Sequence, residues 1–321
     1  MKNKIIIVSG DPNSINSEII FKCWKKLSST LKKNIYLISN YDLLKDQFTK
    51  LGYKIKLQQV DNIDEKVDKK AIKIINIKLN FKNSFKISEQ EASAFVVKSL
   101  NLAHRLALKK NVKGLINCAI NKRLLKKKNY GVTEFLAAKC SIKNNSEAML
   151  IRNDKFSVCP VTTHIEIKNI SKKLNRNLII NKTRTIDSWF TKILKKKPKI
   201  GVLGLNPHNS ELKTTSEENQ IIIPSIKYLK KKKIKIHGPL VSDTVFIKDF
   251  KKYDIILGMY HDQVLSPFKT IYKFDAINVT LGLKYLRVSP DHGTAFNLIG
   301  KNKANSLSLL KCINFINKFG K

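Results

Sequence analysis

Long apolar runs are absent from this sequence. The richest, such as residues 5–8 and 221–223, have the length of a strand, far below the roughly 18 residues that a membrane-spanning helix needs. We therefore expect no membrane segment and no membrane partner. The chain passes from Met1 into the strand-like residues 5–8 without the apolar core of a signal peptide, so we expect a cytoplasmic protein.

Cysteine and acidic residues are both scarce. The five cysteines form no C-x-x-C pair, which argues against a zinc ribbon or a disulfide framework and favours reduced thiols. Asp and Glu number 24 against 62 Lys and Arg, so the formal net charge is +38. Such a charge can indicate a nucleic-acid partner. Because the lysines are spread over the whole chain rather than gathered in one arm, we expect no nucleic-acid role, although an anionic substrate would be attracted.

Short apolar runs alternate with amphipathic stretches, a rhythm that is typical of βαβ units and predicts an α/β fold. The third predicted helix begins with a capping box, Ser88-x-x-Glu91. No repeat or Gly/Ser linker marks a domain boundary. Predicted strands cover 4–9, 34–38, 113–117, 148–151, 157–161, 199–203, 254–258 and 276–280; predicted helices cover 17–31, 42–51, 88–108, 186–195 and 224–232.

Three histidines each follow a predicted strand: His164, His208 and His261. Ligands of open α/β sheets collect beyond the carboxyl ends of strands, so the three imidazoles could face one crevice. Three imidazole ligands would hold a divalent metal ion and leave a coordination position for a substrate oxygen. A single loop histidine is more often a capping or hydrogen-bonding residue, and the pattern by itself leaves both interpretations open.

Positive side chains follow the last of these histidines. Lys269 supplies a compact charge and Arg287 a planar fork, a combination suited to phosphate and carboxylate recognition, with Asn278 between them. Arg287 is the more informative of the two cations because it sits in an apolar run of a chain whose basic residues are mostly lysine.

A glycine-containing segment near the end of the chain has the residue types of a nucleotide loop. Gly293 allows close backbone approach, and His292 and Asn305 can form hydrogen bonds with adenine or ribose. No G-x-G-x-x-G follows the first strand, where Gly10 and Asp11 stand instead, so an ordinary Rossmann site is not supported. The G-x-S-x-G, Walker A and H-E-x-x-H motifs are absent as well.

Taken together, several motifs resemble the 4-hydroxythreonine-4-phosphate dehydrogenase family over nearly the whole chain. They occur in the right order, which makes coincidence improbable. The segments that carry the resemblance are 119–122, 131–136, 161–164, 204–208, 238–240, 243–244, 259–263, 278–283 and 291–295.

The resemblance implies a site and an assembly. His164, His208 and His261 would bind one divalent metal ion per site (zinc, magnesium or cobalt), with the site shared across a homodimer. A small phosphorylated hydroxy acid would be held by Thr133, Lys269, Asn278 and Arg287. The cofactor would be NAD, with NADP as the alternative, bound by the adenine loop through His292, Gly293, Thr294, Ala295 and Asn305.

The resemblance also implies a fold. It is the two-domain α/β/α architecture of isocitrate and isopropylmalate dehydrogenases, with the active site in the interdomain cleft. We expect residues 1–128 with 294–321 to form the first domain and residues 129–293 the second. The adenine loop of that architecture would explain the missing Rossmann glycines.

The implied reaction is the NAD-dependent oxidation and decarboxylation of 4-phosphooxy-L-threonine in pyridoxal 5'-phosphate synthesis. The metal would lower the pKa of the substrate hydroxyl. Asp243 and Asp262 are candidates for relaying protons or for orienting metal ligands, and the sequence does not choose between these roles.

One departure from the family leaves the substrate open. Val132 stands where the family usually has a histidine that contacts substrate, and a valine cannot form that hydrogen bond. The alternatives are a dehydrogenase of another four-carbon phosphorylated acid, such as an erythronate or threonate phosphate, and a member that has lost turnover. A charge-driven nucleic-acid binder is the alternative from another class of protein.

Overall fold

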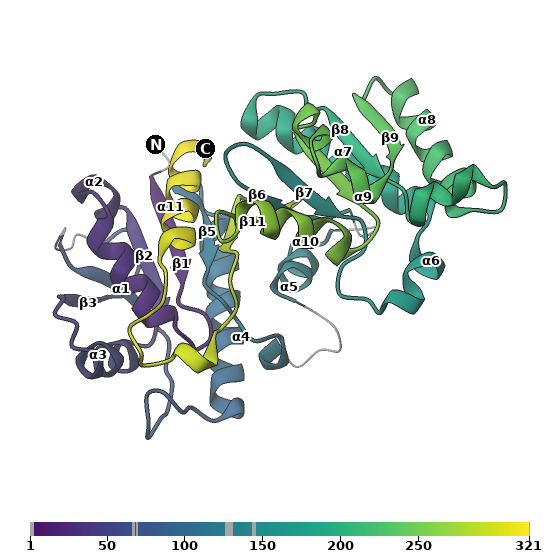
Figure 1. The fold of residues 1–321 in the computed structure, drawn as a ribbon. Helices are drawn as coiled ribbons and strands as arrows, with labels where there is room; N and C mark the ends of the chain where they lie inside the picture. Colours follow the sequence, from purple (N-terminus) through teal and green to yellow (C-terminus); the bar gives the residue numbers. More distant parts are fainter. Residues whose placement is uncertain (1–2, 66–67, 69, 126–130, 143–145, 321) are drawn as a thin grey trace. The chain divides into compact units, whose positions relative to one another are not determined.

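The computed structural model describes residues 3–65, 68, 70–125, 131–142 and 146–320. Their contacts divide the chain into two compact units (Figure 1). Unit 1 consists of Met1–Lys139 and Lys284–Lys321, and unit 2 of Cys140–Leu283. The chain therefore leaves unit 1, builds unit 2 and returns to finish unit 1.

Unit 1 contains a fully parallel sheet in the order β3-β4-β2-β1-β5-β12. Its central strands are continuous apolar runs, as expected for strands that are buried on both faces. The strands are β1 (Lys4–Val8), β2 (Ile35–Ser39), β3 (Leu57–Val60), β4 (Ile72–Asn76), β5 (Val112–Asn117) and β12 (Arg287–Pro290).

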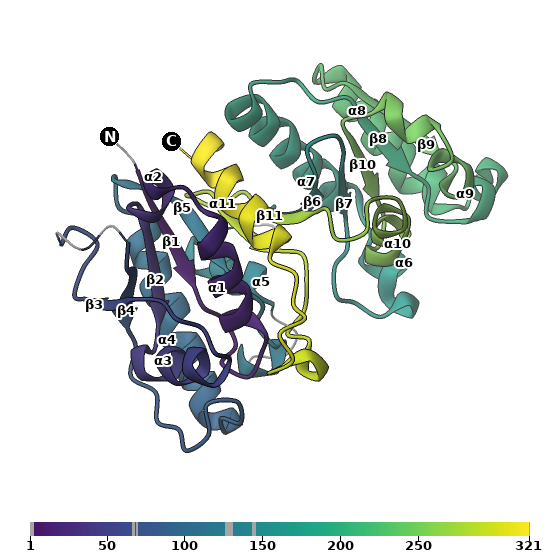
Figure 2. The same cartoon turned by 60° about the vertical axis from the view of Figure 1, so that its left-hand side comes forward.

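Helices cover both faces of this sheet, with α1 and α11 on one side and α4 on the other (Figure 2). The helices of unit 1 are α1 (Asn16–Lys26), α2 (Ser29–Lys32), α3 (Tyr41–Lys50), α4 (Glu89–Ala107), α5 (Val132–Lys139) and α11 (Leu307–Phe319), with short 3₁₀ turns at Lys122–Leu125 and Phe296–Leu298. The helix expected over 17–31 is interrupted, because Leu27 is extended and Ser28 caps a second helix through a bond from the Leu31 amide. Only half of the expected capping box forms: Ser88 accepts from the Glu91 amide, while the Glu91 carboxylate accepts from Asn80.

The bounds of unit 1 differ from those of the expected first domain, 1–128 with 294–321. Unit 1 also includes α5 and β12. The physical reason is contact: α5 packs on α4, and β12 pairs with β5 in parallel register.

Unit 2 contains a mixed sheet in the order β11-β6-β7-β10-β8-β9. The pairs β11–β6 and β6–β7 are antiparallel, and the remaining pairs are parallel. The strands are β6 (Ala148–Arg152), β7 (Ser157–Pro160), β8 (Ile200–Leu203), β9 (Ile236–Leu240), β10 (Ile255–Gly258) and β11 (Ile277–Leu281).

The core of unit 2 includes a cluster of aromatic rings, in which Phe156 packs edge-on against Phe250 and stacks on Phe268. The helices are α6 (Ile170–Lys173), α7 (Arg176–Trp189), α8 (Ile223–Lys231), α9 (Ser242–Val245) and α10 (His261–Tyr272), with single turns at Ile167–Asn169, Phe190–Leu194, Pro207–Leu212, Glu218–Ile222 and Asp249–Lys252. The predicted α/β fold is confirmed in both units.

The structure bears on two features of the sequence, the lack of long apolar runs and the five cysteines. None of the helices in the described parts of the chain has the length and apolarity to cross a membrane. All five cysteines are buried and free of disulfide bonds.

Candidate active site

The three predicted metal ligands follow three adjacent parallel strands of unit 2. His164 comes after β7, His261 opens α10 directly after β10, and His208 comes after β8. Since β7, β10 and β8 are neighbours in the sheet, their carboxyl ends lie at one edge. We call the segments 161–164, 204–212 and 259–263 the histidine loops.

Two of the histidine loops are joined. The amides of Val161 and Thr162 donate to the carbonyls of Gly258 and Met259, at 2.7 and 3.1 Å, and the Thr162 hydroxyl donates to Met259 at 2.7 Å. These bonds bring the imidazoles of His164 and His261 side by side, with ring centroids 5.6 Å apart.

The third histidine does not join them within one chain. His208 is exposed on a turn, Pro207–Leu212, where the five residues 208–212 all have positive φ. Within the described residues no three His, Cys, Asp or Glu side chains form a group that could hold a metal ion. One copy of the chain thus brings together two of the three predicted ligands.

A glutamine joins two of the histidine loops to each other and to the start of α9. The Gln263 amide donates to the Gly204 carbonyl at 2.7 Å and to the Ser242 hydroxyl at 2.9 Å, and its oxygen accepts from the Met259 amide at 2.7 Å. Sequence reasoning quoted this residue within a motif but gave it no role. Its position, two residues after His261 in the first turn of α10, is the signal that could have found it.

A buried glutamate organises the loop that leads to His208. Glu218 is fully buried and accepts from the amides of Leu205 and Asn206, at 2.7 and 2.9 Å, and from the Asn206 side chain. Burial acts to raise the pKa of Glu218, but the hydrogen bonds from Asn206 and Leu205 hold that pKa below its usual value. No sequence motif marked this residue, because its partners lie about a dozen positions earlier.

The other predicted residues of unit 2 have varied surroundings. Asp262 is exposed and pairs with His261, its Oδ1 2.6 Å from the imidazole Nδ1. Asp243 is exposed in the first turn of α9, and Lys269 is exposed on α10. Asn278 is half-buried in β11, and its side-chain oxygen has no hydrogen-bond partner among the residues that the structure describes.

Unit 1 contributes a buried guanidinium. Arg287 in β12 is 3% exposed, and its Nε donates to Asn117 Oδ1 at 2.7 Å while its Nη1 donates to Thr133 Oγ1 at 3.3 Å. Burial lowers the pKa of Arg287 to about 10, with nearby Tyr285 acting in the opposite direction, so the group is still charged at neutral pH. We call Arg287, Asn117 and Thr133 the arginine network; two of its members were predicted as substrate ligands, and Asn117 was not.

The turn that begins α5 presents Thr133 to this network. The Gly131 amide donates to the Glu134 carboxylate at 2.9 Å, which fixes the start of the helix. Val132, at the position where the family usually has histidine, is half-buried and packs against an apolar cluster that contains Phe95 and Leu124. The valine therefore has a packing role in unit 1.

The predicted cofactor segment is tied to the first turn of the chain. The Ile15 amide donates to the Thr294 carbonyl at 3.2 Å. Burial lowers the pKa of His292, against the opposing effect of its bond with the Gly293 carbonyl, so the imidazole is neutral near pH 7. Its Nε2 is buried and has no partner within the described parts of the chain. Ala295 has a positive φ, and the side chain of Asn305 accepts from the Leu307 amide at 2.9 Å.

Comparison with known families decides what this arrangement belongs to. Residues 31–316 match the model of the family described as pyridoxal phosphate biosynthetic protein PdxA. The chain belongs to this family. It is 36% identical to the 4-hydroxythreonine-4-phosphate dehydrogenase of Sulfurihydrogenibium sp. (strain YO3AOP1), over 97% of this chain and 96% of that protein. It is 35% identical to the enzyme of the same name from Aquifex aeolicus, over 98% of both.

Solved structures of proteins with the same name share the fold of this chain. The crystal structure of 4-hydroxythreonine-4-phosphate dehydrogenase from Klebsiella pneumoniae superposes with a TM-score of 0.83 at 27% identity, covering 98% of each chain. A β-decarboxylating dehydrogenase from Thermococcus kodakarensis has a TM-score of 0.50 at 11% identity, which concerns the fold alone. The expected relation to the isocitrate and isopropylmalate dehydrogenase architecture is thereby confirmed at the level of fold.

Proposed function

We propose that this chain is a metal-dependent, NAD-linked dehydrogenase that oxidises and decarboxylates 4-phosphooxy-L-threonine to 3-amino-2-oxopropyl phosphate, a step of pyridoxal 5'-phosphate synthesis. Full-length relatives named 4-hydroxythreonine-4-phosphate dehydrogenase support the substrate. The observation that carries the proposal is the arginine network. Arg287 is a buried cation that donates to two neutral acceptors, Asn117 and Thr133, and a guanidinium is a group that binds phosphate well.

The arginine network orients the substrate by its phosphate. The planar guanidinium has five N–H donors, and its bonds to Asn117 and Thr133 fix the plane of the fork. Lys269 adds an exposed positive charge, and Asn278 adds an amide whose buried oxygen has no hydrogen-bond partner among the described residues. Thr133 accepts a hydrogen bond from Arg287. A threonine hydroxyl can also donate a hydrogen bond to a phosphate oxygen.

The histidine loops supply the metal ligands in this proposal. With Nδ1 bonded to Asp262, His261 would present the lone pair of Nε2 to a cation, so Asp262 acts by fixing the tautomer. A divalent ion held by His164, His208 and His261 would lower the pKa of the substrate hydroxyl and stabilise developing negative charge. Asp243 is the remaining candidate for moving a proton, because it is exposed and acidic.

The incomplete ligand set supports a homodimer. One chain places His164 beside His261, and no third ligand joins them within the described residues. A second copy of the chain that supplied the third imidazole would complete the metal site. We also expect the enzyme to be cytoplasmic. His292, Gly293, Thr294, Ala295 and Asn305 would hold the adenine end of NAD, with the neutral Nε2 of His292 as a hydrogen-bond acceptor.

The proposal is tested by measuring NADH formation from 4-phosphooxy-L-threonine with and without added divalent metal. We expect turnover that a chelator abolishes and that is lost in His261→Gln. The matched control is His237→Gln, which removes an exposed histidine of β9. Metal retention without turnover on any substrate would identify a member that keeps the fold but has lost activity.

A second candidate is the oxidation of another four-carbon phosphorylated acid. Val132 favours it, because its side chain packs on an apolar cluster and offers a substrate no hydrogen bond. Erythronate and threonate phosphates should be assayed in parallel. If one of these acids gave NADH and 4-phosphooxy-L-threonine gave none, that acid would be the substrate and the first proposal would be wrong.

A further inference from the structure

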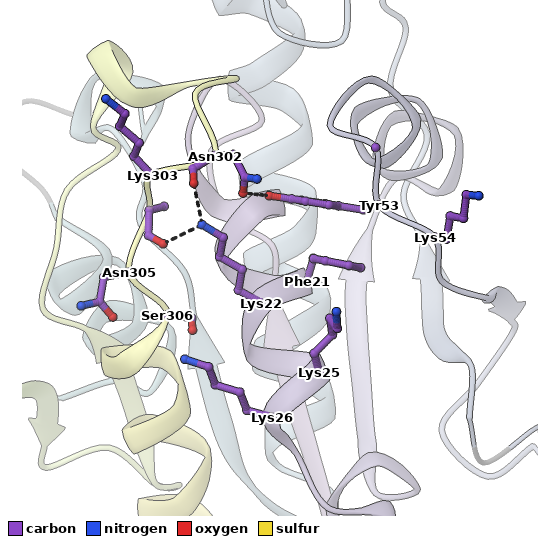
Figure 3. Close-up of a pocket in the computed structure, with 12 residues that line it drawn as sticks. Phe21, Lys22, Lys25, Lys26, Tyr53, Lys54, Asn302, Lys303, Asn305 and Ser306 are labelled. Atoms are coloured by element: carbon purple, nitrogen blue, oxygen red, sulfur yellow. Dashed lines mark hydrogen bonds between the residues drawn. The ribbon is translucent and has the colours of Figure 1, made fainter.

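A large basic pocket lies in unit 1 between α1, the residues after α3 and the segment that precedes α11 (Figure 3). Its volume is about 950 Å³, at the upper end of the range for small-molecule sites. Its described lining includes five lysines and no acidic residue. The lysines are Lys22, Lys25, Lys26, Lys54 and Lys303.

One wall of the pocket is fixed by an ion pair between a half-buried lysine and a buried glutamate. Lys22 Nζ binds Glu18 Oε1 at 2.7 Å and donates to the carbonyls of Asn302 and Ala304, at 2.9 and 3.2 Å. The Ala304 amide donates to the same carboxylate oxygen at 2.6 Å. The segment 302–304 is therefore held against α1 whether or not the pocket is filled, and Lys22 has its own counterion.

The opposite side is aromatic. Phe21 and Tyr53 are stacked, with centroids 3.8 Å apart and planes 3° from parallel. The Tyr53 hydroxyl donates to Asn302 Oδ1 at 2.5 Å, which joins the aromatic side to the fixed wall (Figure 3). Lys25 lies over the Phe21 ring at 5.7 Å.

Two independent features point to an anion at the end of the pocket near α11. Ser306 is 2% exposed and lines the pocket, and its hydroxyl has no hydrogen-bond partner within the part of the chain that is described. Ser306 also immediately precedes α11, a helix of 13 residues whose positive dipole end therefore faces the pocket. Figure 3 shows the Lys26 side chain extending along α1 toward Ser306.

The remaining lysines supply charge that nothing nearby neutralises. Lys26 and Lys303 are exposed, and neither forms an ion pair among the described residues. A buried hydroxyl that lacks a partner costs free energy, and an anion oxygen would remove that cost.

We infer that this pocket binds a phosphate-bearing small molecule, with the phosphate between Lys26 and the Ser306 hydroxyl at the start of α11, and with Lys303 adding positive charge to the pocket lining. The site is separate from the proposed metal and substrate residues, none of which lines it. It includes the proposed cofactor residue Asn305 and, from the same segment, Asn302, Lys303 and Ala304. The inference does not depend on the proposed function.

The test is calorimetric titration of the whole protein with inorganic pyrophosphate at constant ionic strength. We expect saturable binding that Lys26→Gln with Lys303→Gln weakens by about tenfold or more, since charge-assisted hydrogen bonds are the strong ones. Ser306→Ala should weaken it by about threefold. The matched control is Lys230→Gln with Lys231→Gln, two exposed lysines of α8, for which we expect less than about a twofold change.

Three results would overturn the inference. The first is an absence of saturable binding. The second is an equal loss in both double-lysine variants, which would mean a general effect of net charge. The third is loss of binding in Arg287→Lys while the Lys26 and Lys303 variant binds normally, which would place the pyrophosphate at the arginine network.

A second titration distinguishes the source of the phosphate. If phenyl phosphate binds more tightly than inorganic phosphate and Tyr53→Leu removes the difference, the ligand is an aromatic organic phosphate. Equal affinities identify a free phosphate. Either outcome supports the site, because both require the end of the pocket that Lys26 and Ser306 line.

Discussion

The arginine network of unit 1 and the histidine loops of unit 2 differ in burial and in how complete each set of residues is within one chain. Arg287 is buried, and it donates to side chains of β5 and α5 in the same unit. The histidines are at least partly exposed on loops, and only two of the three lie together. The proposed phosphate-binding residues are thus assembled when one chain folds, whereas the proposed metal site would need a further component. Variants of the two regions should differ accordingly, from a large effect on turnover to a small one on stability.

The largest effect should come from the histidine loops. His208→Ala and His261→Ala should each lose about a thousandfold or more in kcat, because a catalytic metal contributes several kcal/mol of charge stabilisation. If two copies share each site, with His164 and His261 from one copy, each mixed dimer of the two variants has one intact site. Coexpression should then restore about a quarter of the wild-type activity in the whole mixture, because about half of the dimers are mixed. His237→Ala is the control. Complete inactivity of the mixture would mean that each site draws its ligands from a single copy.

The arginine network should respond next. Arg287→Lys should lower kcat/KM by about 100-fold, because lysine cannot reproduce the bonds that a planar fork makes. The metal content should be unchanged, since the histidine loops belong to unit 2 and the arginine network to unit 1. Arg152→Lys is a control for replacing a partly buried arginine, because Arg152 donates to Ser157 in unit 2. An equal loss in both variants would contradict a substrate role for Arg287.

Asn117 should have a smaller effect through Arg287. Asn117→Ala removes the acceptor of the 2.7 Å bond from Nε, so we expect the KM for the phosphorylated substrate to rise about tenfold. The control is Asn153→Ala, which removes another buried amide that accepts two backbone N–H groups, in unit 2. Both variants should lose stability, and only the first should change KM. Equal KM values for the two would reduce Asn117 to a structural residue.

The smallest effect concerns stability rather than turnover. Asp11 is 3% exposed, and burial raises the pKa of its carboxyl to about 6, against the hydrogen bonds from the Asn13 and Asn121 amides. Because this folded-state pKa lies above the unfolded value of 3.8, the contribution to stability is present below pH 3.8 and is lost as the pH rises through 6.

Asp11→Asn should remove that dependence. Between pH 4 and 7 the wild type should lose up to about 3 kcal/mol more unfolding free energy than the variant, as measured by urea denaturation. Parallel curves for the two proteins would mean that the Asp11 carboxyl keeps its ordinary pKa. Exposed Asp42→Asn serves as the control.

The sequence predicted most of the strands that have strong apolar patterns, but it missed β4, whose residues Ile72, Ile74 and Ile75 are buried. The expected strands at 113–117 and 199–203 lie within one residue of β5 and β8. The strands β3 and β9 were not predicted, because both lie at sheet edges and carry polar or turn-forming residues. These residues are Gln58 and Gln59 in β3, and Gly238 and Pro239 in β9. The strand β12 was not predicted, because it begins with a charged residue, Arg287, whose burial depends on partners that are distant in the sequence.

The same distinction applies to the site. The histidines could be placed at the ends of strands because chain order alone determines which residue succeeds a strand. Asn117 could not be assigned to Arg287, because the two are 170 positions apart and meet only through the pairing of β12 with β5. Glu218 was missed for a related reason, since its bonds to residues 205 and 206 depend on a loop conformation that no apolar period encodes.

The turn that carries His208 has an energetic consequence. Its residues from His208 to Leu212 all adopt the left-handed conformation, and none of them is glycine. Left-handed backbone costs roughly 1–2 kcal/mol for each such residue, so the free loop would gain by relaxing. A cation that required this geometry would spend part of its binding energy on holding the loop, and glycine at position 210 or 211 should therefore increase metal affinity.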